Sequence, residues 1–186
     1  CTKVFQGSIP VSFSPLRRFL RLFSKKCYLE LKLNADLPLI DANTTQLRQV
    51  LMNLVINASE ALGDTSGTIR VVTGWQMCDQ AYFGDASVGN MLPEGTYVFL
   101  EVSDTGSGMT EETRTKLFDP FYSTKFAGRG LGMATVSGIA RGHRAAIKLT
   151  SELGKGSSFR VLFPASTSAD AIPVGKVVGS GEWRGF

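Results

Sequence analysis

Helical spacing of apolar residues marks two long segments of the chain. Between a predicted cap at Asn43 or Thr44 and a terminating Gly63, apolar side chains recur every three to four residues, as in a helix that lies on a core. Residues 128–141 have the same character and begin with a cluster of glycines. Shorter helices are expected at 14–26 and 110–116.

Alternation of apolar and polar residues marks the strands. Residues 154–156, Gly-Lys-Gly, have the composition of a hairpin turn between two such segments. Residues 79–95 are rich in Gly, Asp, Asn and Pro, which predicts a long loop. Strands are expected at 27–34, 68–77, 96–103, 146–151 and 157–163.

Composition limits the classes of function. A length of 186 residues with 43% hydrophobic content suits one domain of ordinary size. The formal charge of +4 comes without a long basic block, which argues against nucleic acid as the main partner but suits an anionic nucleotide. Three widely spaced cysteines predict neither a disulfide framework nor a zinc site. No apolar run reaches the length of a membrane span, so we expect a cytoplasmic segment without membrane contact, either free or within a longer, membrane-linked sensor.

Polar side chains follow one margin of the helix expected at 43–63. Asn53, Asn57 and Glu60 are spaced i, i+4 and i+7, so they share one face of that helix. Asparagine is a poor residue for a helix interior because its side chain competes for backbone hydrogen bonds. Two asparagines on one helix face therefore suggest a role other than helix formation. The stripe is either an exposed polar edge or a ligand site, and the helix alone leaves both open.

Two glycine clusters carry the next candidate chemistry. Asp104 ends the strand at 96–103 and leads into Gly106 and Gly108, where its carboxylate either lies at the floor of a cavity or belongs to an ordinary solvated turn. The second cluster, residues 128–133, opens a helix whose backbone N–H groups and dipole favour an anion such as phosphate. That cluster matches neither the dinucleotide-binding fingerprint nor the Walker loop.

Between the two clusters, residues 117–125 place three aromatic side chains around Pro120. Phe118 and Phe121 are predicted to pack into the core and to hold the segment against the domain. Lys125 is the member of the segment whose side chain has chemistry to offer a ligand.

The order of these motifs resembles the catalytic, ATP-binding domain of bacterial sensor histidine kinases, within the gyrase, Hsp90, histidine kinase and MutL superfamily. The likeness covers about residues 27–164 and is greatest to the nitrogen-sensor and PAS-linked hybrid branch. It implies an α/β fold: a two-layer α/β sandwich of the Bergerat type, with a mixed sheet, helices on one face and the nucleotide between them. The matching motifs are the N box at 53–62, the G1 box at 104–109, the F box at 117–125, the G2 box at 128–133 and the G3 turn at 154–159.

The resemblance also implies roles for single residues. Asp104 would accept a hydrogen bond from the adenine amino group, Ser157 would assist through water, and Asn57 would bind Mg²⁺ through its carbonyl oxygen. The glycines of the G1 box would let the base lie close to the backbone, and amides of the G2 box would hold the triphosphate. The implied catalytic set is Asn53, Asn57, Glu60 and Lys125, and the implied ATP-binding set is Asn53, Asn57, Ala61, Asp104, Gly106, Gly108, Met109, Phe118, Thr124, Lys125, Gly128, Arg129, Gly130, Leu131, Gly132, Met133 and Ser157.

One position separates the kinases of this superfamily from their ATPase relatives. Those relatives carry a glutamate four residues before the metal-binding asparagine, where this chain has Asn53, so the resemblance implies phosphoryl transfer to a histidine rather than to water. We expect that histidine on a separate dimerisation domain outside this chain, with a response-regulator receiver domain as the next partner. His143, the only histidine present, is interpreted as a helix-terminal residue beside the dipole. A non-catalytic ATP-binding module and a gyrase- or chaperone-type ATPase are the alternatives.

The chain departs from the family pattern in two places. Arg129 and Met133 replace the Thr and Leu common in the G2 box. Arg144 and Ala145 stand where the family often has two glycines, which permit a tight turn. The expected divisions are a lead-in of the same domain at 1–26, the ATP-binding domain at 27–165 and a linker or tail at 166–186.

Overall fold

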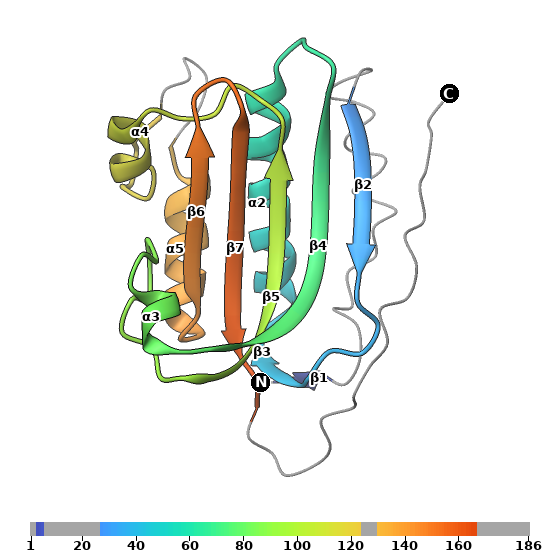
Figure 1. The fold of residues 1–186 in the computed structure, drawn as a ribbon, viewed down its shortest axis with the longest axis vertical. Helices are drawn as coiled ribbons and strands as arrows, with labels where there is room; N and C mark the ends of the chain where they lie inside the picture. The colour runs from blue at the N-terminus through green and yellow to red at the C-terminus, as the bar shows by residue number, and fades with distance from the viewer. Residues whose placement is uncertain (1–2, 6–26, 124–129, 167–186) are drawn as a thin grey trace.

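A mixed five-stranded sheet forms the centre of the molecule (Figure 1). The computed structural model describes residues 3–5, 27–123 and 130–166. The two strands nearest one edge, β2 and β4, run parallel, and every other neighbouring pair in this sheet is antiparallel. In spatial order the strands are β2 (Cys27–Leu33), β4 (Gly67–Cys78), β5 (Gly95–Asp104), β7 (Gly156–Pro164) and β6 (Ala146–Glu152).

A second, two-stranded sheet was not expected from the sequence. It pairs β1 (Lys3–Phe5) with β3 (Ile40–Ala42) in antiparallel register, with residue 4 opposite residue 41. Three-residue strands are too short to show a period of two, and their partners lie far apart along the chain. The helix expected at 14–26 lies outside the described residues.

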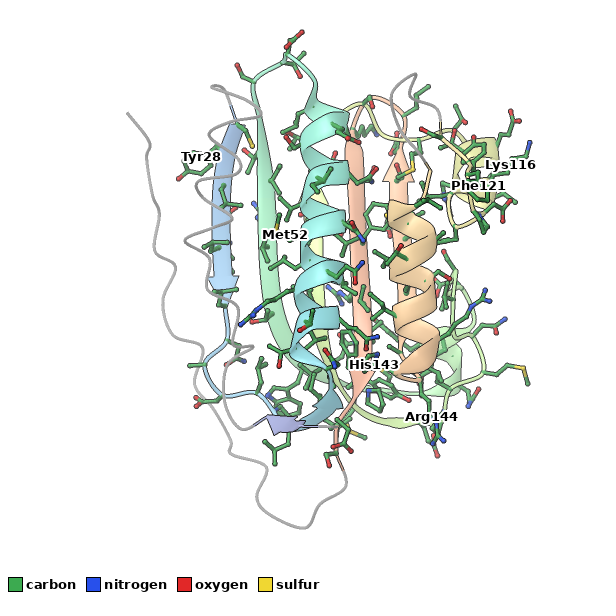
Figure 2. The ribbon with its side chains drawn as sticks, turned by 180° about the vertical axis from the view of Figure 1, so that it is seen from behind. Tyr28, Met52, Lys116, Phe121, His143 and Arg144 are labelled. Carbon is green, nitrogen blue, oxygen red and sulfur yellow. The ribbon has the colours of Figure 1, made fainter. Side chains whose placement is uncertain are left out.

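Two helices cover one face of the central sheet, as the resemblance implies (Figures 1 and 2). The longer, α2 (Thr44–Leu62), begins at the predicted cap, where the Asn43 side-chain oxygen accepts hydrogen bonds from the N–H groups of Thr45 and Gln46. The other is α5 (Gly132–Gly142). Buried apolar residues of both helices meet those of the inner sheet face in one continuous core. Among them are Val50, Leu54, Val98, Leu100, Val136 and Phe159.

The opposite sheet face is covered at one end by the segment that the composition predicted to be a loop. It contains a short helix, α3 (Gln80–Phe83), capped by Asp79, so the loop prediction is wrong there. Phe83 is fully buried and meets Tyr97 edge-on at 5.0 Å between ring centroids. Burial in the same small core raises the pKa of the Cys78 thiol, which keeps it protonated. A single turn has no periodicity of its own, so packing on the sheet decides this conformation.

The predicted first residue is correct for one of two helices and wrong for the other. α4 (Glu111–Lys116) begins after Thr110, whose hydroxyl accepts from the Thr113 N–H, as the sequence predicts. α5 begins at Gly132, four residues later than expected, because the left-handed backbone of Gly130 (φ 64°) cannot belong to a right-handed helix. None of the helices in the described part of the chain is long and apolar enough to cross a membrane.

The turn after α5 has a left-handed backbone at a residue that is not glycine. Arg144 has φ 51°, in the left-handed region, at the place where the family often has glycine. His143 caps the helix just before it, with Nδ1 donating to the Ile139 carbonyl and Nε2 accepting from the Asn43 N–H. The turn therefore joins the end of α5 to the start of α2, but at the cost of a strained arginine.

We expect Arg144→Gly to raise the free energy of unfolding by about 0.5–1 kcal/mol, because glycine adopts this backbone without steric cost. Urea unfolding of the 186-residue chain measures the change. The matched control is Arg141→Gly, three residues earlier in the last turn of α5, which should lower stability by about 1 kcal/mol. A loss of stability in Arg144→Gly as large as that in the control would contradict the strained turn.

Candidate functional site

Three polar side chains form a row across one end of the inner sheet face. Asp104 on β5 lies opposite Ser157 on β7, and Ser157 lies opposite Ser151 on β6. The next row inward is wholly apolar, formed by Val102, Phe159 and Leu149. Asp104 is 7% exposed and Ser157 is 6% exposed. Burial of a carboxylate and a hydroxyl at the edge of an apolar face marks this end of the sheet as a candidate site.

The turn after Asp104 supplies a partner for its carboxylate. Oδ1 accepts a hydrogen bond of 2.8 Å from the Gly106 N–H. The Thr105 hydroxyl accepts from the N–H of Thr68, and the Thr105 N–H donates to the Thr68 carbonyl, so the turn is tied to β4. The Gly106 N–H thereby holds the carboxylate against the turn that follows it.

The glycines of this turn allow close approach to other parts of the chain. A Cβ built on Gly106 would lie 2.6 Å from the backbone carbonyl of Ala61, at the end of α2, and the Ser107 N–H donates to that same carbonyl. Gly108 has φ 64°, and a Cβ there would collide with the Glu152 carbonyl oxygen on β6. The turn thus packs between α2 and the β6–β7 hairpin, which brings Ala61 beside Gly106.

The polar stripe of α2 meets the start of α5 at Asn53. Asn53 and Asn57 are half-buried, whereas Glu60 is exposed. A Cβ built on Gly132 would lie 3.8 Å from Asn53 Oδ1, which places that amide at the first turn of α5. Within residues 27–123 and 130–166, neither asparagine side chain has a hydrogen-bond partner. The stripe therefore offers ligand-binding atoms between two helices.

The N-terminus of α5 has the geometry expected of an anion site. Leu131 is the N-cap residue and makes no side-chain capping hydrogen bond to the first turn. Gly130 packs directly on the F-box segment: its carbonyl accepts from the Phe121 N–H at 3.1 Å, and a Cβ on it would lie 2.6 Å from the Tyr122 carbonyl oxygen. Four predicted residues of this region lie outside the described part of the chain: Thr124, Lys125, Gly128 and Arg129.

Aromatic residues of the F-box segment divide between core and surface. Phe118 and Met109 are partly buried against the main core, and Met133 is a buried member of that core. Phe121 is 78% exposed with φ 68°, so the prediction that it packs into the core is wrong. The left-handed backbone directs its side chain to solvent while its N–H bonds to Gly130.

Metal-binding potential at this site comes from oxygen atoms. No group of three or more His, Cys, Asp and Glu that could hold a metal occurs among the described residues. The amide oxygens of Asn53 and Asn57 are hard metal ligands. A small number of such ligands suits Mg²⁺, which keeps most of its bound waters and takes further oxygen ligands from phosphate. His143 lies at the far end of α2 and α5 with both ring nitrogens engaged (Figure 2).

The site thus combines a buried acceptor at Asp104, the amide side chains of α2 and the uncapped N-terminus of α5. A family model described as Histidine kinase-, DNA gyrase B-, and HSP90-like ATPase matches residues 42–167, more than half of the chain. The chain belongs to this family. The family confirms the resemblance inferred from the motifs, and a domain of this ATPase family implies ATP as its nucleotide.

Sensor kinases are among the most similar relatives of this ATPase-family chain. Sensor kinase CckA of Brucella abortus is 34% identical over 161 residues, which cover 83% of this chain and 16% of that protein. The sensory histidine kinase/phosphatase NtrB of Rhizobium meliloti is 35% identical over 147 residues, which cover 77% of this chain and 37% of that protein. The chain therefore spans a minor part of each relative's length.

Solved histidine kinase structures share the fold of this family member. The catalytic domain of histidine kinase ThkA is 27% identical with a TM-score of 0.60, covering 82% of this chain and 87% of that one. Full-length ShkA in complex with AMPPNP is 25% identical with a TM-score of 0.60, covering 91% of this chain and 33% of that one. The mycobacterial sensor histidine kinase MprB, 17% identical with a TM-score of 0.62, covers 89% of this chain and 98% of that one and shows the shared fold alone.

Proposed function

We propose that this chain binds Mg-ATP with the adenine at Asp104 and Ser157 and the phosphates at the start of α5. The observation that carries the proposal is the buried Asp104 carboxylate, a hydrogen-bond acceptor held by the Gly106 N–H at the floor of the site. The adenine amino group is a donor of matching chemistry. Backbone N–H groups of residues 130–133, at a helix N-terminus, have the partial positive charge that a triphosphate needs.

The proposed metal site uses Asn57, with Asn53 and Glu60 toward the phosphates or the metal's waters. When bound, Mg²⁺ would neutralise phosphate charge and orient the transferring group. Lys125 would add a positive charge from the F-box segment. The remaining residues of the proposed ATP-binding set are Ala61, Gly106, Gly108, Met109, Phe118, Thr124, Gly128, Arg129, Gly130, Leu131, Gly132 and Met133.

The proposed reaction is transfer of the γ-phosphoryl group to a histidine on a dimerisation domain, followed by use of that group by a response-regulator receiver domain. Relatives named sensor histidine kinases and the ShkA complex with AMPPNP support this choice. Hydrolysis needs a base to activate water, and Asn53 has no titratable group in the position where the ATPases carry glutamate. His143 is an unsuitable acceptor because its two nitrogens bond to Ile139 and Asn43.

Asp104→Asn should weaken ATP binding about 10- to 100-fold, because it replaces a charged acceptor by an amide of the same shape. Titration with a ribose-labelled fluorescent ATP analogue, followed by displacement with ATP, measures the change. Asp85→Asn is the matched control, since Asp85 is exposed and pairs with Lys148 on the opposite sheet face. Equal affinity in Asp104→Asn and the control would reject the adenine assignment.

Asn57→Ala should lower ATP affinity about tenfold in Mg²⁺ and little in EDTA, since the missing oxygen matters only with the metal present. The same displacement titration in the two buffers gives the ratio. Asn90→Ala, at an exposed loop position, is the control and should keep the wild-type ratio. An undiminished effect of Mg²⁺ in Asn57→Ala would count against the metal assignment.

Phosphoryl transfer is tested by incubating the chain with γ-labelled ATP and its cognate histidine-bearing helical domain. We expect acid-labile label on that domain and little release of inorganic phosphate. The control is the Asp104→Asn variant, which should lower both the label on the helical domain and the release of phosphate, because it binds ATP more weakly. Steady phosphate release without a labelled histidine would identify hydrolysis, and binding without either product would identify a non-catalytic module.

A further inference from the structure

A polar pocket of about 360 Å³ lies on the outer face of the sheet, the face opposite α2 and α5. It is formed where β5 ends and where β2 and β4 begin, at the top of the sheet in Figure 1. Strand register brings two charged side chains and a hydroxyl together here, because Glu30 lies opposite Arg70 and Arg70 lies opposite Ser103. Three further hydroxyls line the pocket, from Tyr28, Thr68 and Thr105.

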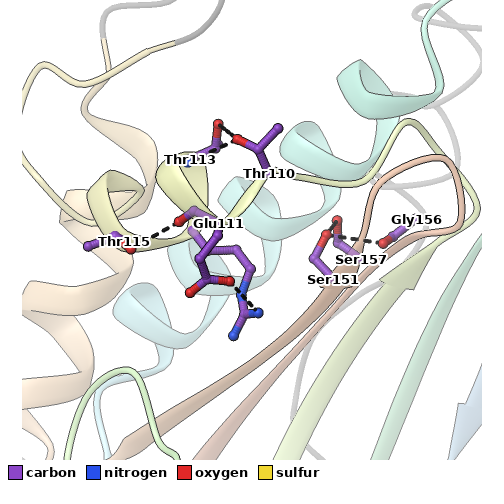
Figure 3. Close-up of polar contacts among 8 residues, drawn as sticks. Thr110, Glu111, Thr113, Thr115, Ser151, Gly156 and Ser157 are labelled. Atoms are coloured by element: carbon purple, nitrogen blue, oxygen red, sulfur yellow. Dashed lines mark hydrogen bonds and ion pairs between the residues drawn. The ribbon is translucent and has the colours of Figure 1, made fainter.

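Most hydroxyls of this pocket have no acceptor in the protein. On the inner sheet face, the hydroxyl oxygens of Ser151 and Ser157 are 3.0 Å apart and share a hydrogen bond (Figure 3). In the pocket, by contrast, the hydroxyls of Tyr28, Thr68 and Ser103 have no hydrogen-bond partner among the described residues. These hydroxyls can therefore donate to a bound molecule without giving up a bond within the fold.

The Arg70 guanidinium and the Thr105 hydroxyl add further donors. Arg70 Nε donates to Glu30 at 2.5 Å. An arginine carries five N–H donors, so even a two-point contact with one carboxylate leaves most of them available. The Thr105 hydroxyl accepts from the Thr68 N–H at 3.0 Å, which leaves its own proton for another acceptor. The pocket thus offers hydrogen-bond donors from β4, from β5 and from the turn after β5.

Glu30 is the carboxylate that faces this pocket, and it is paired with two cations. Its oxygens contact Lys32 Nζ at 3.0 Å and Arg70 Nε at 2.5 Å. The hydrogen bond from Arg70, followed by that from Lys32, lowers the pKa of Glu30, so the carboxylate stays ionised. Two cations and one carboxylate leave this group with one net positive charge. The Asp104 side chain lies on the inner face instead, in the row with Ser157.

We propose that this pocket binds a small tetrahedral oxyanion of the phosphate class, held by the Arg70 guanidinium and by the hydroxyls of Thr68 and Ser103. The oxygens of phosphate mainly accept hydrogen bonds at neutral pH, and bonds from a guanidinium to such oxygens are charge-assisted. A cation would meet the guanidinium and would find the facing carboxylate already paired. Free phosphate and a phosphate monoester share the recognised chemistry.

Phosphate titration of the ¹⁵N-labelled 186-residue chain, followed by amide NMR at constant ionic strength, tests the inference. We expect saturable shifts of the Thr68, Ser103 and Thr105 amide signals, because these residues line the pocket. Phosphate bound at the start of α5 would instead shift the amides of residues 130–133, so the spectrum separates this pocket from the proposed nucleotide site.

Variants of the lining should change the affinity in opposite directions. Arg70→Gln should weaken phosphate binding about tenfold, and Ser103→Ala should weaken it about threefold. Glu30→Gln should strengthen it about threefold, because it removes the facing negative charge and frees Arg70. Arg141→Gln is the matched control: it removes one exposed arginine from the last turn of α5 and should leave the affinity unchanged.

Glycerol 3-phosphate, titrated in the same way, separates the two sources of the ligand. Affinity equal to or above that of phosphate identifies a monoester as the ligand, and lower affinity identifies the free ion; both results support the pocket.

Three outcomes would overturn the inference. The first is the absence of saturable shifts at the pocket amides, including shifts confined to residues 130–133. The second is unchanged affinity in both Arg70→Gln and Ser103→Ala, two variants that report independently if one of them does not fold. The third is loss of binding in Glu30→Gln, which would make the carboxylate part of the binding group. None of these outcomes bears on the nucleotide site, which the Asp104→Asn titration tests separately.

Discussion

The buried carboxylate of Asp104 is the constraint around which this end of the molecule is arranged. A carboxylate at 7% exposure loses much of its hydration, and this is tolerable only where hydrogen bonds replace the lost water. The Gly106 N–H supplies one of these bonds. Placing that N–H requires a tight turn against α2, which the Gly106 and Ala61 backbones achieve by approaching more closely than any side chain at Gly106 would allow. The end of α2, the turn and the β6–β7 hairpin are therefore parts of a single packed unit.

The two long helices connect this unit to the other end of the domain. α2 and α5 both lie on the inner sheet face, and both belong to the proposed site, α2 through Asn53 and Asn57 and α5 through its N-terminus. At the opposite end, His143 bonds to Ile139 on α5 and to the Asn43 cap of α2. Because helices are stiff, this joint holds their far ends together and limits how far they can separate at the site.

Polar contacts on the outer sheet face support the fold rather than the site. Arg160 bonds to Glu101, Gln76 and Tyr82, and the Lys148 ammonium lies 4.0 Å from the centre of the Tyr82 ring. Burial alone would lower the pKa of Arg160, but its hydrogen bonds to Tyr82 and Glu101 outweigh burial and raise it. These contacts fasten the α3 segment to the sheet face opposite α2 and α5.

Local periodicity in the sequence was sufficient to predict the five strands of the main sheet, α2 with its Asn43 cap, and α4 with its Thr110 cap, because those signals lie within a few residues of one another. The motif order was sufficient to predict the family, because five motifs that are each weak alone occur in the family's order along the chain. The short β1–β3 pair, the buried Phe83, the exposed Phe121 and the contact between the Ser151 and Ser157 hydroxyls were decided only by the tertiary structure. Each depends on a partner distant in the chain or on a backbone dihedral that packing determines. Distant partners and such dihedrals produce no periodic pattern of apolar residues in the sequence.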